Sequence, residues 1–344
     1  MSPKNGSQSV VSDPQWIPSH WDRSAGTLQF VHVPRERHGE LTFLAEEYLG
    51  PARLPTTTVS IAELSAAPLQ STAPRFVFHS AFCCSTLVAR ALDIPGTAIA
   101  LKEPQILNEL ADTARSGALS GEMFGLVMSL LGRPSGPEER VIIKPSNVVN
   151  VLAPALMNGN AQSRAVFLYA PLRRFLVSVV GKGLWGRRWS RRLYAQLLSD
   201  TGLKFGFADA EQFELSDLQV AALAWLMHHV QGAALLGQFP GRVRTLDSET
   251  FLARRADALA ALAEHLELDL NRKQAGIIAT GPVFATHSKE VGRKFDPEDS
   301  LAPRASIAVI DEEIDMVSTW LTHVADHVGV TTQFSEESAL LAAG

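Results

Sequence analysis

The chain has 344 residues, of which 46% are hydrophobic and 19% are charged, and its formal net charge is −5. A chain of this size and composition can bury a large core, as ordinary globular proteins do. The net charge provides no overall basic field for nucleic acid or for an anionic membrane surface, so an anionic ligand would have to be held by a local cluster. We therefore expect a small-molecule ligand, and neither nucleic acid nor a membrane as a partner.

The sequence shows no signal-peptide pattern and few cysteines, and both features indicate a reduced compartment. The sequence has no run of 18 or more apolar residues, and its first residues, MSPKNGSQSVVSDPQW, lack the charged-then-apolar pattern of a signal peptide. The only two cysteines, Cys83 and Cys84, are adjacent, so they are poorly placed to bridge and cannot form a structural zinc site by themselves. The sequence predicts a cytoplasmic protein without a metal site.

The composition divides the chain into three parts. Residues 1–74 begin polar and turn-rich and then contain the strand-like run TLQFVHV (27–33), so they form an N-terminal extension with short strands. Residues 75–330 form the main domain, and residues 331–344 form a C-terminal tail. Within the main domain, the charged, proline-bearing run at 286–304 is typical of a loop over a site.

Short apolar runs alternate with helical periodicity through the main domain. Runs without polar alternation are typical of strands that helices cover on both faces, and they occur at 75–79, 97–102, 140–144, 165–170 and 242–246. Apolar residues recur at helical spacing at 216–236, 250–268 and 306–328, and Ser216 with Gln219 matches a capping box. The fold class is therefore α/β, with a doubly wound parallel sheet of four to five strands.

The segment FVFHSAFCCSTLVARAL (76–92) carries the strongest sign of a ligand. An apolar strand runs into small residues and then into a helix that starts near Ser85 and Thr86, which would present amide N–H groups and two hydroxyls to an anion. The loop has no glycine and no lysine, so it does not match G-x-x-x-x-G-K-[ST]. A tight strand-to-helix turn without a ligand is an equal alternative.

Five segments, in order, resemble the sulfotransferases that use 3′-phosphoadenosine 5′-phosphosulfate (PAPS), and the divergent bacterial members in particular. The first, HSAFCCSTLVARAL, resembles the loop that holds the 5′-phosphosulfate. LKEPQILNEL (101–110) resembles the family's Glu-Pro-Gln segment, and IIKPSNVVN (142–150) resembles its Lys-x-Pro stretch. FLYAPLRRFLVSVV (167–180) resembles the motif that binds the 3′-phosphate. RVRTLDSETFLARRADALAALAEHLEL (242–268) resembles the late strand and helix of the domain.

The resemblance implies a P-loop sulfotransferase fold with PAPS as co-substrate, and it implies roles for particular residues. Glu103 would be the base that deprotonates the acceptor, and Lys144 would stabilise the transferring group. The residues that would bind PAPS are Ser80, Ala81, Phe82, Cys83, Cys84, Ser85 and Thr86 at the 5′ end, Arg173, Arg174 and Ser178 at the 3′-phosphate, and Lys289 and Arg293 in a clamping loop.

Two departures from the family pattern remove positive charge. Phe82, Cys83 and Cys84 stand where the family usually has a Lys or Arg, and Ala170 stands eight residues before Ser178, where an Arg is typical. A phosphate site depends on such cations. Arg173 or Arg174 would have to supply the second charge.

Each assignment has a structural alternative. Glu103 could cap the helix that follows Pro104, and Lys144 could be a surface lysine at a strand end. One of the two arginines could be solvated. The basic run at 182–192, with its interleaved tryptophans, could bind the adenine or an acidic acceptor, or it could be a charged amphipathic helix. The buried histidines His228 and His229 fit the core better than a metal site.

The sequence therefore predicts an enzyme that transfers a sulfuryl group from PAPS to a hydroxyl or amine of a small molecule. Two other functions stay open: a P-loop small-molecule kinase that uses ATP and Mg²⁺, and a non-catalytic nucleotide-binding member of the fold.

Overall fold

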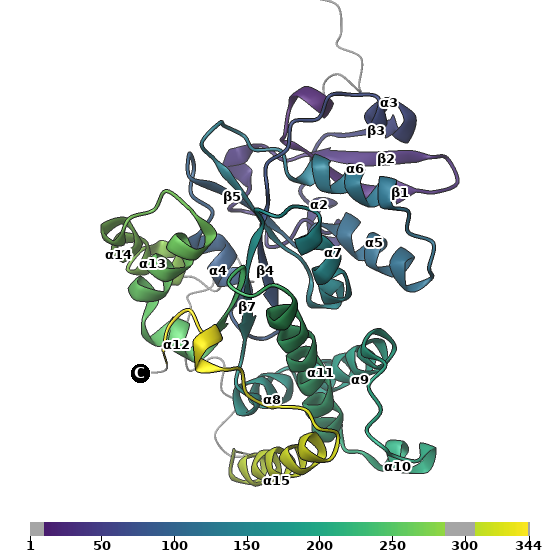
Figure 1. The fold of residues 1–344 in the computed structure, drawn as a ribbon, viewed down its shortest axis with the longest axis vertical. Helices are drawn as coiled ribbons and strands as arrows, with labels where there is room; N and C mark the ends of the chain where they lie inside the picture. The colour runs from purple at the N-terminus through teal and green to yellow at the C-terminus, as the bar shows by residue number, and fades with distance from the viewer. Residues whose placement is uncertain (1–9, 286–306, 343–344) are drawn as a thin grey trace, which may run out of the picture.

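A five-stranded parallel sheet forms the centre of the protein (Figure 1). The computed structural model describes residues 10–285 and 307–342. The strand order is β5-β6-β4-β7-β8, so β4 lies between β6 and β7. The strands are β4 (Arg75–His79), β5 (Ala98–Lys102), β6 (Arg140–Lys144), β7 (Arg164–Tyr169) and β8 (Val243–Asp247).

Both faces of the sheet are covered, which explains why its strands lack polar alternation. In β4, Phe76 and Phe78 enter one core and Val77 enters the other. The helices of the Val77 side are α4 (Ser85–Ala91), α8 (Leu172–Gly181), α9 (Gly183–Thr201), α11 (Asp217–Gln238), α13 (Arg255–Leu266), α14 (Arg272–Ala279) and α15 (Ile307–His327). The helices of the other side are α5 (Gln105–Arg115), α6 (Gly121–Leu131), η2 (Asn147–Leu152) and α7 (Ala153–Asn158).

Most predicted helices are confirmed. The capping box at the start of α11 is formed, because Ser216 Oγ accepts from Gln219 N (3.2 Å) and Gln219 Oε1 accepts from Ser216 N (2.9 Å). The run at 250–268 forms two helices, α12 (Ser248–Ala253) and α13, because the chain bends at Arg254. Three short helices occur elsewhere in the second half of the chain: α10 (Asp209–Glu214), η3 (Pro282–Phe284) and η6 (Glu336–Ser338).

Helix α11 is long and apolar enough to cross a membrane by length and composition, although 67% of its most apolar window is buried inside the fold. A core helix passes the same test, so this feature alone is weak evidence for a membrane span.

The N-terminal extension contains a second sheet of three antiparallel strands (Figure 1). The strands are β1 (Trp16–Asp22), β2 (Thr27–His32) and β3 (Thr56–Ser60), so the predicted strand at 27–33 is confirmed. Helices α5 and α6 pack against β1, and the two sheets share one hydrophobic core. Three short helices connect the strands to the main domain: η1 (Arg35–Arg37), α2 (Glu46–Leu49) and α3 (Ile61–Ser65).

Lys102, at the end of β5, fastens the extension to the parallel sheet. Its side chain is fully buried, and Nζ donates to His38 O at 2.5 Å. Its carbonyl accepts from Leu44 N (2.7 Å), and Leu44 O accepts from Gln105 N (2.9 Å). Burial lowers the pKa of Lys102 to about 8, and the nearby carboxylate of Asp93 opposes that shift.

The C-terminal tail lies along the free edge of β8. Ala339 forms a parallel bridge with Thr245, and Leu340 N donates to Thr245 O at 2.8 Å. The tail thus occupies hydrogen-bonding groups of an edge strand that would otherwise be exposed.

Replacement of the buried lysine tests how the two sheets are joined. In the folded protein Lys102 loses its proton near pH 8, whereas in the unfolded chain it keeps it until about pH 10.4. Between these values the unfolded state binds more protons, so this residue should make the unfolding free energy rise with pH, by up to about 1.4 kcal/mol per pH unit.

Urea denaturation of the wild type and of Lys102→Met, at pH 7 to 10, isolates that contribution, because the variant keeps every other titrating group. One such group is Cys83, whose thiol pKa burial raises to about 11. We expect the wild type minus variant difference to rise with pH, and equal slopes for the two proteins would contradict this assignment.

Candidate functional site

The loop between β4 and α4 is held in a strained conformation. Ala81, Phe82 and Cys84 have φ values of 68°, 48° and 62°, and Glu103, on the neighbouring strand end, has 51°. A residue other than glycine pays roughly 1–2 kcal/mol to adopt this left-handed conformation. The described part of the chain has six non-glycine residues with positive φ, and these four line one cavity. Strain concentrated at one place is typical of a functional site.

Hydrogen bonds from both sides hold this loop. His79 Nδ1 accepts from Ala81 N (3.1 Å), so in a neutral ring Nε2 carries the proton and can donate to Pro145 O (3.1 Å). Ser80 N donates to Leu168 O (3.1 Å) on β7. The strained backbone is therefore fixed by the two strands that flank β4.

Side chains occupy the places where the family has a cation. The ring of Phe82 packs against Phe175 of α8 and edge-on against Trp189 of α9, with centroids 5.6 Å and 4.9 Å apart. Cys83 is buried, and burial raises its thiol pKa to about 11, so it stays protonated and unreactive at neutral pH. The loop is thus anchored by apolar packing.

Glu103 and Lys144 form an ion pair at the carboxyl edge of the sheet. Lys144 is completely buried, and its ammonium contacts the Glu103 carboxylate, which is 21% exposed. Lys144 Nζ also lies 2.9 Å from His79 Nε2 and 5.5 Å from the ring centroid of Phe43. The expectation of a surface lysine is therefore wrong, and Lys144 lies beneath Glu103.

The helix-capping alternative for Glu103 is also wrong. The N-cap of α5 is Pro104, which makes no side-chain cap bond, whereas the Glu103 side chain is bound to Lys144. The strands place these two residues together, because β5 and β6 pair with Lys102 opposite Lys144, and Glu103 N donates to Lys144 O at 2.7 Å.

A cavity of about 280 Å³ opens above this pair and the strained loop. Glu103 and the hydroxyl-bearing residues Ser85 and Thr86 line it together, as the sequence predicts for a site at this edge. Its lining includes two carboxylates and four large aromatic rings, and no Lys or Arg of the described residues. The full lining is Phe43, Glu47, His79, Ala81, Phe82, Cys83, Cys84, Ser85, Thr86, Glu103, Ser146, Asn147, Trp185 and Trp189.

The residues predicted for the 3′-phosphate lie outside this cavity. Arg173 forms ion pairs with Asp311 (2.7 Å) and Asp315 (2.5 Å) of α15. Ser178 Oγ donates to the carbonyl of Arg174 at 2.9 Å, so these two residues share a half-buried face of α8. Arg173 is thus engaged with α15, and the 3′-phosphate role of Arg174 and Ser178 stays a prediction.

The position of the missing arginine is closed. Ala170 is buried, and its carbonyl accepts from the indole of Trp225 at 2.8 Å. The two clamping residues, Lys289 and Arg293, lie outside the described residues.

The sequence left open whether the run that forms α9 binds a ligand, and it did not indicate that the tryptophans would line the cavity. The basic run at 182–192 is an amphipathic helix whose Arg187 and Arg191 pair with Asp217 at 3.6 Å and 2.6 Å. Its tryptophans, Trp185 and Trp189, instead line the cavity. The interleaved tryptophans were the one signal in the sequence that could have identified this wall.

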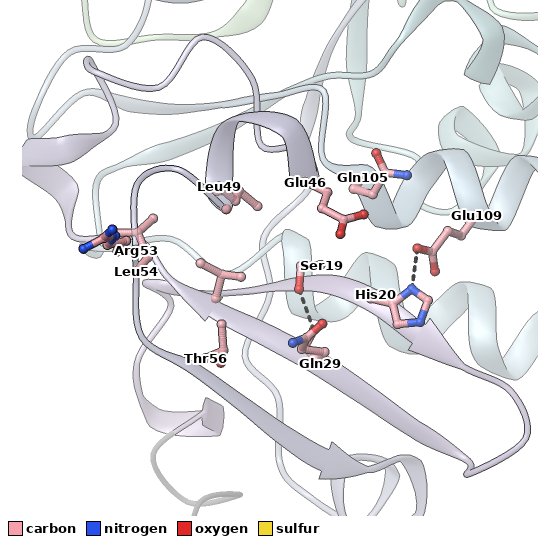
Figure 2. A pocket seen from close by; sticks show the side chains of 12 residues that line it. Ser19, His20, Gln29, Glu46, Leu49, Arg53, Leu54, Thr56, Gln105 and Glu109 are labelled. Atoms are coloured by element: carbon pink, nitrogen blue, oxygen red, sulfur yellow. Dashed lines mark hydrogen bonds and ion pairs between the residues drawn. The ribbon is translucent and has the colours of Figure 1, made fainter.

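A second cavity, of about 450 Å³, lies in the N-terminal extension (Figure 2). His20 Nδ1 and the carboxylate of Glu109 on α5 are 2.8 Å apart, and this contact raises the pKa of His20. A bulge in β1 places Ser19 and His20 side by side in the lining, with Glu46 of α2 above them. The sequence gives no sign of the bulge.

The remaining histidines behave as the sequence predicts. Burial lowers the pKa of His228 to about 4 and that of His229 to about 3, so both are neutral core residues. Asn147 Nδ2 lies 3.1 Å from His228 Nε2. Within residues 10–285 and 307–342, no group of three His, Cys, Asp or Glu side chains could hold a metal ion.

Comparisons with known proteins identify sulfotransferases among solved structures only. No family model matches the chain, and no curated protein does. A sulfotransferase domain from the curacin biosynthetic pathway is 14% identical, with 77% of this chain and 100% of that domain covered at a TM-score of 0.42. A sulfotransferase from Alicyclobacillus acidocaldarius is 11% identical, with 76% and 98% covered at a TM-score of 0.40.

A third similar structure is a retinol dehydratase in complex with androsterone and the inactive cofactor PAP. It is 13% identical, with 96% of each chain covered and a TM-score of 0.42. The structural comparison thus finds the proteins that the sequence resemblance predicted. At these identities and scores, the activity has to be argued from the residues of the site.

Two alanine-to-glycine variants measure the strain in the loop. Ala81 has positive φ and Ala89 lies inside α4, and both are buried. Glycine costs about 1 kcal/mol in a helix, whereas at Ala81 relief of the left-handed conformation offsets that cost. We expect Ala89→Gly to lower the unfolding free energy by about 1–2 kcal/mol and Ala81→Gly to change it by less than about 0.5 kcal/mol, measured by urea denaturation. Equal losses would show that the loop is unstrained.

Proposed function

We propose that the protein transfers a sulfuryl group from PAPS to a hydroxyl or amine of a small molecule. The observation that carries the proposal is that Glu103 opens onto the same cavity as the strained loop at 81–86, with its carboxylate held from below by Lys144. The order of the sequence motifs that resemble PAPS-dependent sulfotransferases supports it as well.

The residues of the cavity fit the 5′ end of PAPS, which would supply an activated sulfuryl group. Ser85 and Thr86 present hydroxyl donors beside the strained loop. One oxygen of Glu103 is engaged with Lys144, and the other is available to take the proton of the acceptor. The acceptor oxygen or nitrogen then bonds to sulfur, and the electron pair of the broken S–O bond leaves with adenosine 3′,5′-bisphosphate.

Lys144 acts through Glu103 in this scheme. Its side chain is enclosed, so its ammonium fixes the position and charge of the carboxylate. Phe43 and Glu47 of the N-terminal extension also line the cavity, as do Trp185 and Trp189 of α9, so the acceptor would contact both the extension and α9.

The two other functions have different support. A kinase needs an acid at a strand end to hold Mg²⁺. Glu103 follows β5 and Asp247 ends β8, but Glu103 pairs with Lys144, and Asp247 Oδ1 accepts from Thr250 N (2.8 Å) as the cap of α12. A non-catalytic role is favoured by the absence of Lys and Arg from the described lining of the cavity.

Nucleotide binding separates these three functions. We expect adenosine 3′,5′-bisphosphate to raise the melting temperature more than ATP with Mg²⁺, because the proposed co-substrate carries the same 3′- and 5′-phosphates. Stabilisation follows RT ln(1 + [L]/Kd), so a ligand at 100 times its Kd adds about 2.7 kcal/mol. A shift with ATP and Mg²⁺ alone would favour the kinase, and no shift at millimolar nucleotide would reject the transferase.

A double replacement separates the chemical role of Glu103 from its structural role. Glu103→Gln leaves the buried ammonium of Lys144 without its carboxylate, which should lower the unfolding free energy by about 3 kcal/mol. The further change Lys144→Met removes that ammonium, so the double variant should recover most of the loss. Denaturation midpoints measure both values.

The reaction rate of the double variant should stay low even though its stability recovers. Loss of the base should slow release of adenosine 3′,5′-bisphosphate from PAPS by about a hundredfold, in Glu103→Gln and in the double variant alike. A panel of small hydroxyl and amine acceptors provides the assay. If the double variant regains both stability and rate, Glu103 has no part in the chemistry.

A further inference from the structure

Aromatic rings form one wall of the catalytic cavity. Trp185 and Trp189, one turn apart on α9, stack with their centroids 6.1 Å apart and their planes 13° apart. Phe82 of the loop meets Trp189 edge-on at 4.9 Å, and Phe43 lines the cavity from the N-terminal extension. Trp185 is 59% exposed, so its indole is available at the cavity to a ligand.

Among the described residues that line the cavity, the side chains that carry a charge at neutral pH are the carboxylates of Glu47 and Glu103. Glu103 is neutralised by the buried Lys144, but Glu47 is an exposed carboxylate on α2. None of the ion pairs within the described part of the chain involves Glu47. Burial raises the pKa of the neighbouring Tyr48 phenol, and the charge of Glu47 and a hydrogen bond to its side chain raise that pKa further. Among the described residues, Glu47 is therefore a carboxylate without an ion-pair partner that lines the same cavity as these rings.

We propose that this end of the cavity binds an ammonium group, and that the acceptor is a small alcohol or amine that carries a permanent positive charge. This inference rests on the proposed sulfuryl transfer. The faces of indole and phenyl rings attract cations, and tryptophan does so most strongly. A carboxylate beside such rings adds direct attraction that a neutral molecule does not receive.

The arrangement also explains why the lining tolerates two carboxylates. The reacting hydroxyl or amine would lie at Glu103, near the strained loop, and the charged group would lie at Glu47 and the tryptophans. A cation at that end balances Glu47 and leaves the hydroxyls of Ser85 and Thr86 for the anionic co-substrate.

Choline and its neutral isostere 3,3-dimethyl-1-butanol provide the test. The two molecules have the same shape and hydroxyl and differ in the charge of one atom. We expect choline to bind about three- to tenfold more tightly, measured by calorimetry and by tryptophan fluorescence, since a partly exposed cation–ring contact and a nearby carboxylate together are of that size. Equal affinities, or tighter binding of the isostere, would overturn the inference.

Neighbouring glutamates provide a matched control. Glu46 and Glu47 are adjacent, exposed and both in the first turn of α2, but Glu46 lines the other cavity (Figure 2). Glu47→Gln should weaken choline about three- to tenfold and leave the isostere unchanged, and Glu46→Gln should change neither. Trp185→Leu keeps an apolar side chain and should weaken choline more than the isostere. Equal effects of the two glutamate variants would refute the subsite.

Adenosine 3′,5′-bisphosphate, titrated into the same preparations, distinguishes the two proposals. If it binds and choline has no advantage over the isostere, the ammonium subsite is wrong and the transferase stands. If choline binds selectively and the nucleotide does not bind, the transferase is wrong, and the assignment of the cation as its acceptor is wrong with it.

Discussion

The candidate site depends on one buried ammonium. Lys144 ends β6 with no exposed surface, and a charge so enclosed is costly unless a carboxylate pairs with it. The parallel register of β5 and β6 supplies that carboxylate, because the residue after Lys102 must emerge beside Lys144. Glu103 adopts a left-handed conformation at this point, and its carboxylate is then directed at the ammonium and the cavity together.

The end of β4 is joined to the same group of residues. His79 Nδ1 accepts the amide proton of Ala81, and Nε2 can donate to the carbonyl of Pro145, directly after Lys144, so one histidine joins the strained loop to the strand end that carries the ion pair. Three strand ends thus form a single hydrogen-bonded unit. A change in the loop would therefore alter the position of Glu103, and a change in the pair would alter the loop.

The N-terminal extension is part of this site, although it lies outside the parallel sheet. The contacts of Leu44 with Lys102 and Gln105 fix the segment that precedes α2. That segment and α2 place Phe43 and Glu47 in the cavity that Glu103 lines, and Glu46 in the neighbouring cavity. The loop has lost the cation that its family resemblance leads one to expect, and apolar packing of Phe82 on α8 and α9 replaces it as the anchor. The lining consequently has more rings and carboxylates than a phosphate site usually has.

The sequence by itself determined the parallel sheet and the start of α11, because these follow from local periodicity and capping. Apolar runs such as RVIIK and the pair Ser216 and Gln219 act over a few residues, so each can be read without knowledge of the rest. It also placed Glu103 and the 80–86 loop at one edge of the sheet, since strand ends in a parallel sheet meet there. Only the tertiary structure decided that Lys144 lies beneath Glu103, that Arg173 pairs with α15, and that Trp185 and Trp189 form a wall. Those contacts join segments far apart in the chain, and which side chains meet depends on register, bulges and helix rotation, which local patterns do not encode.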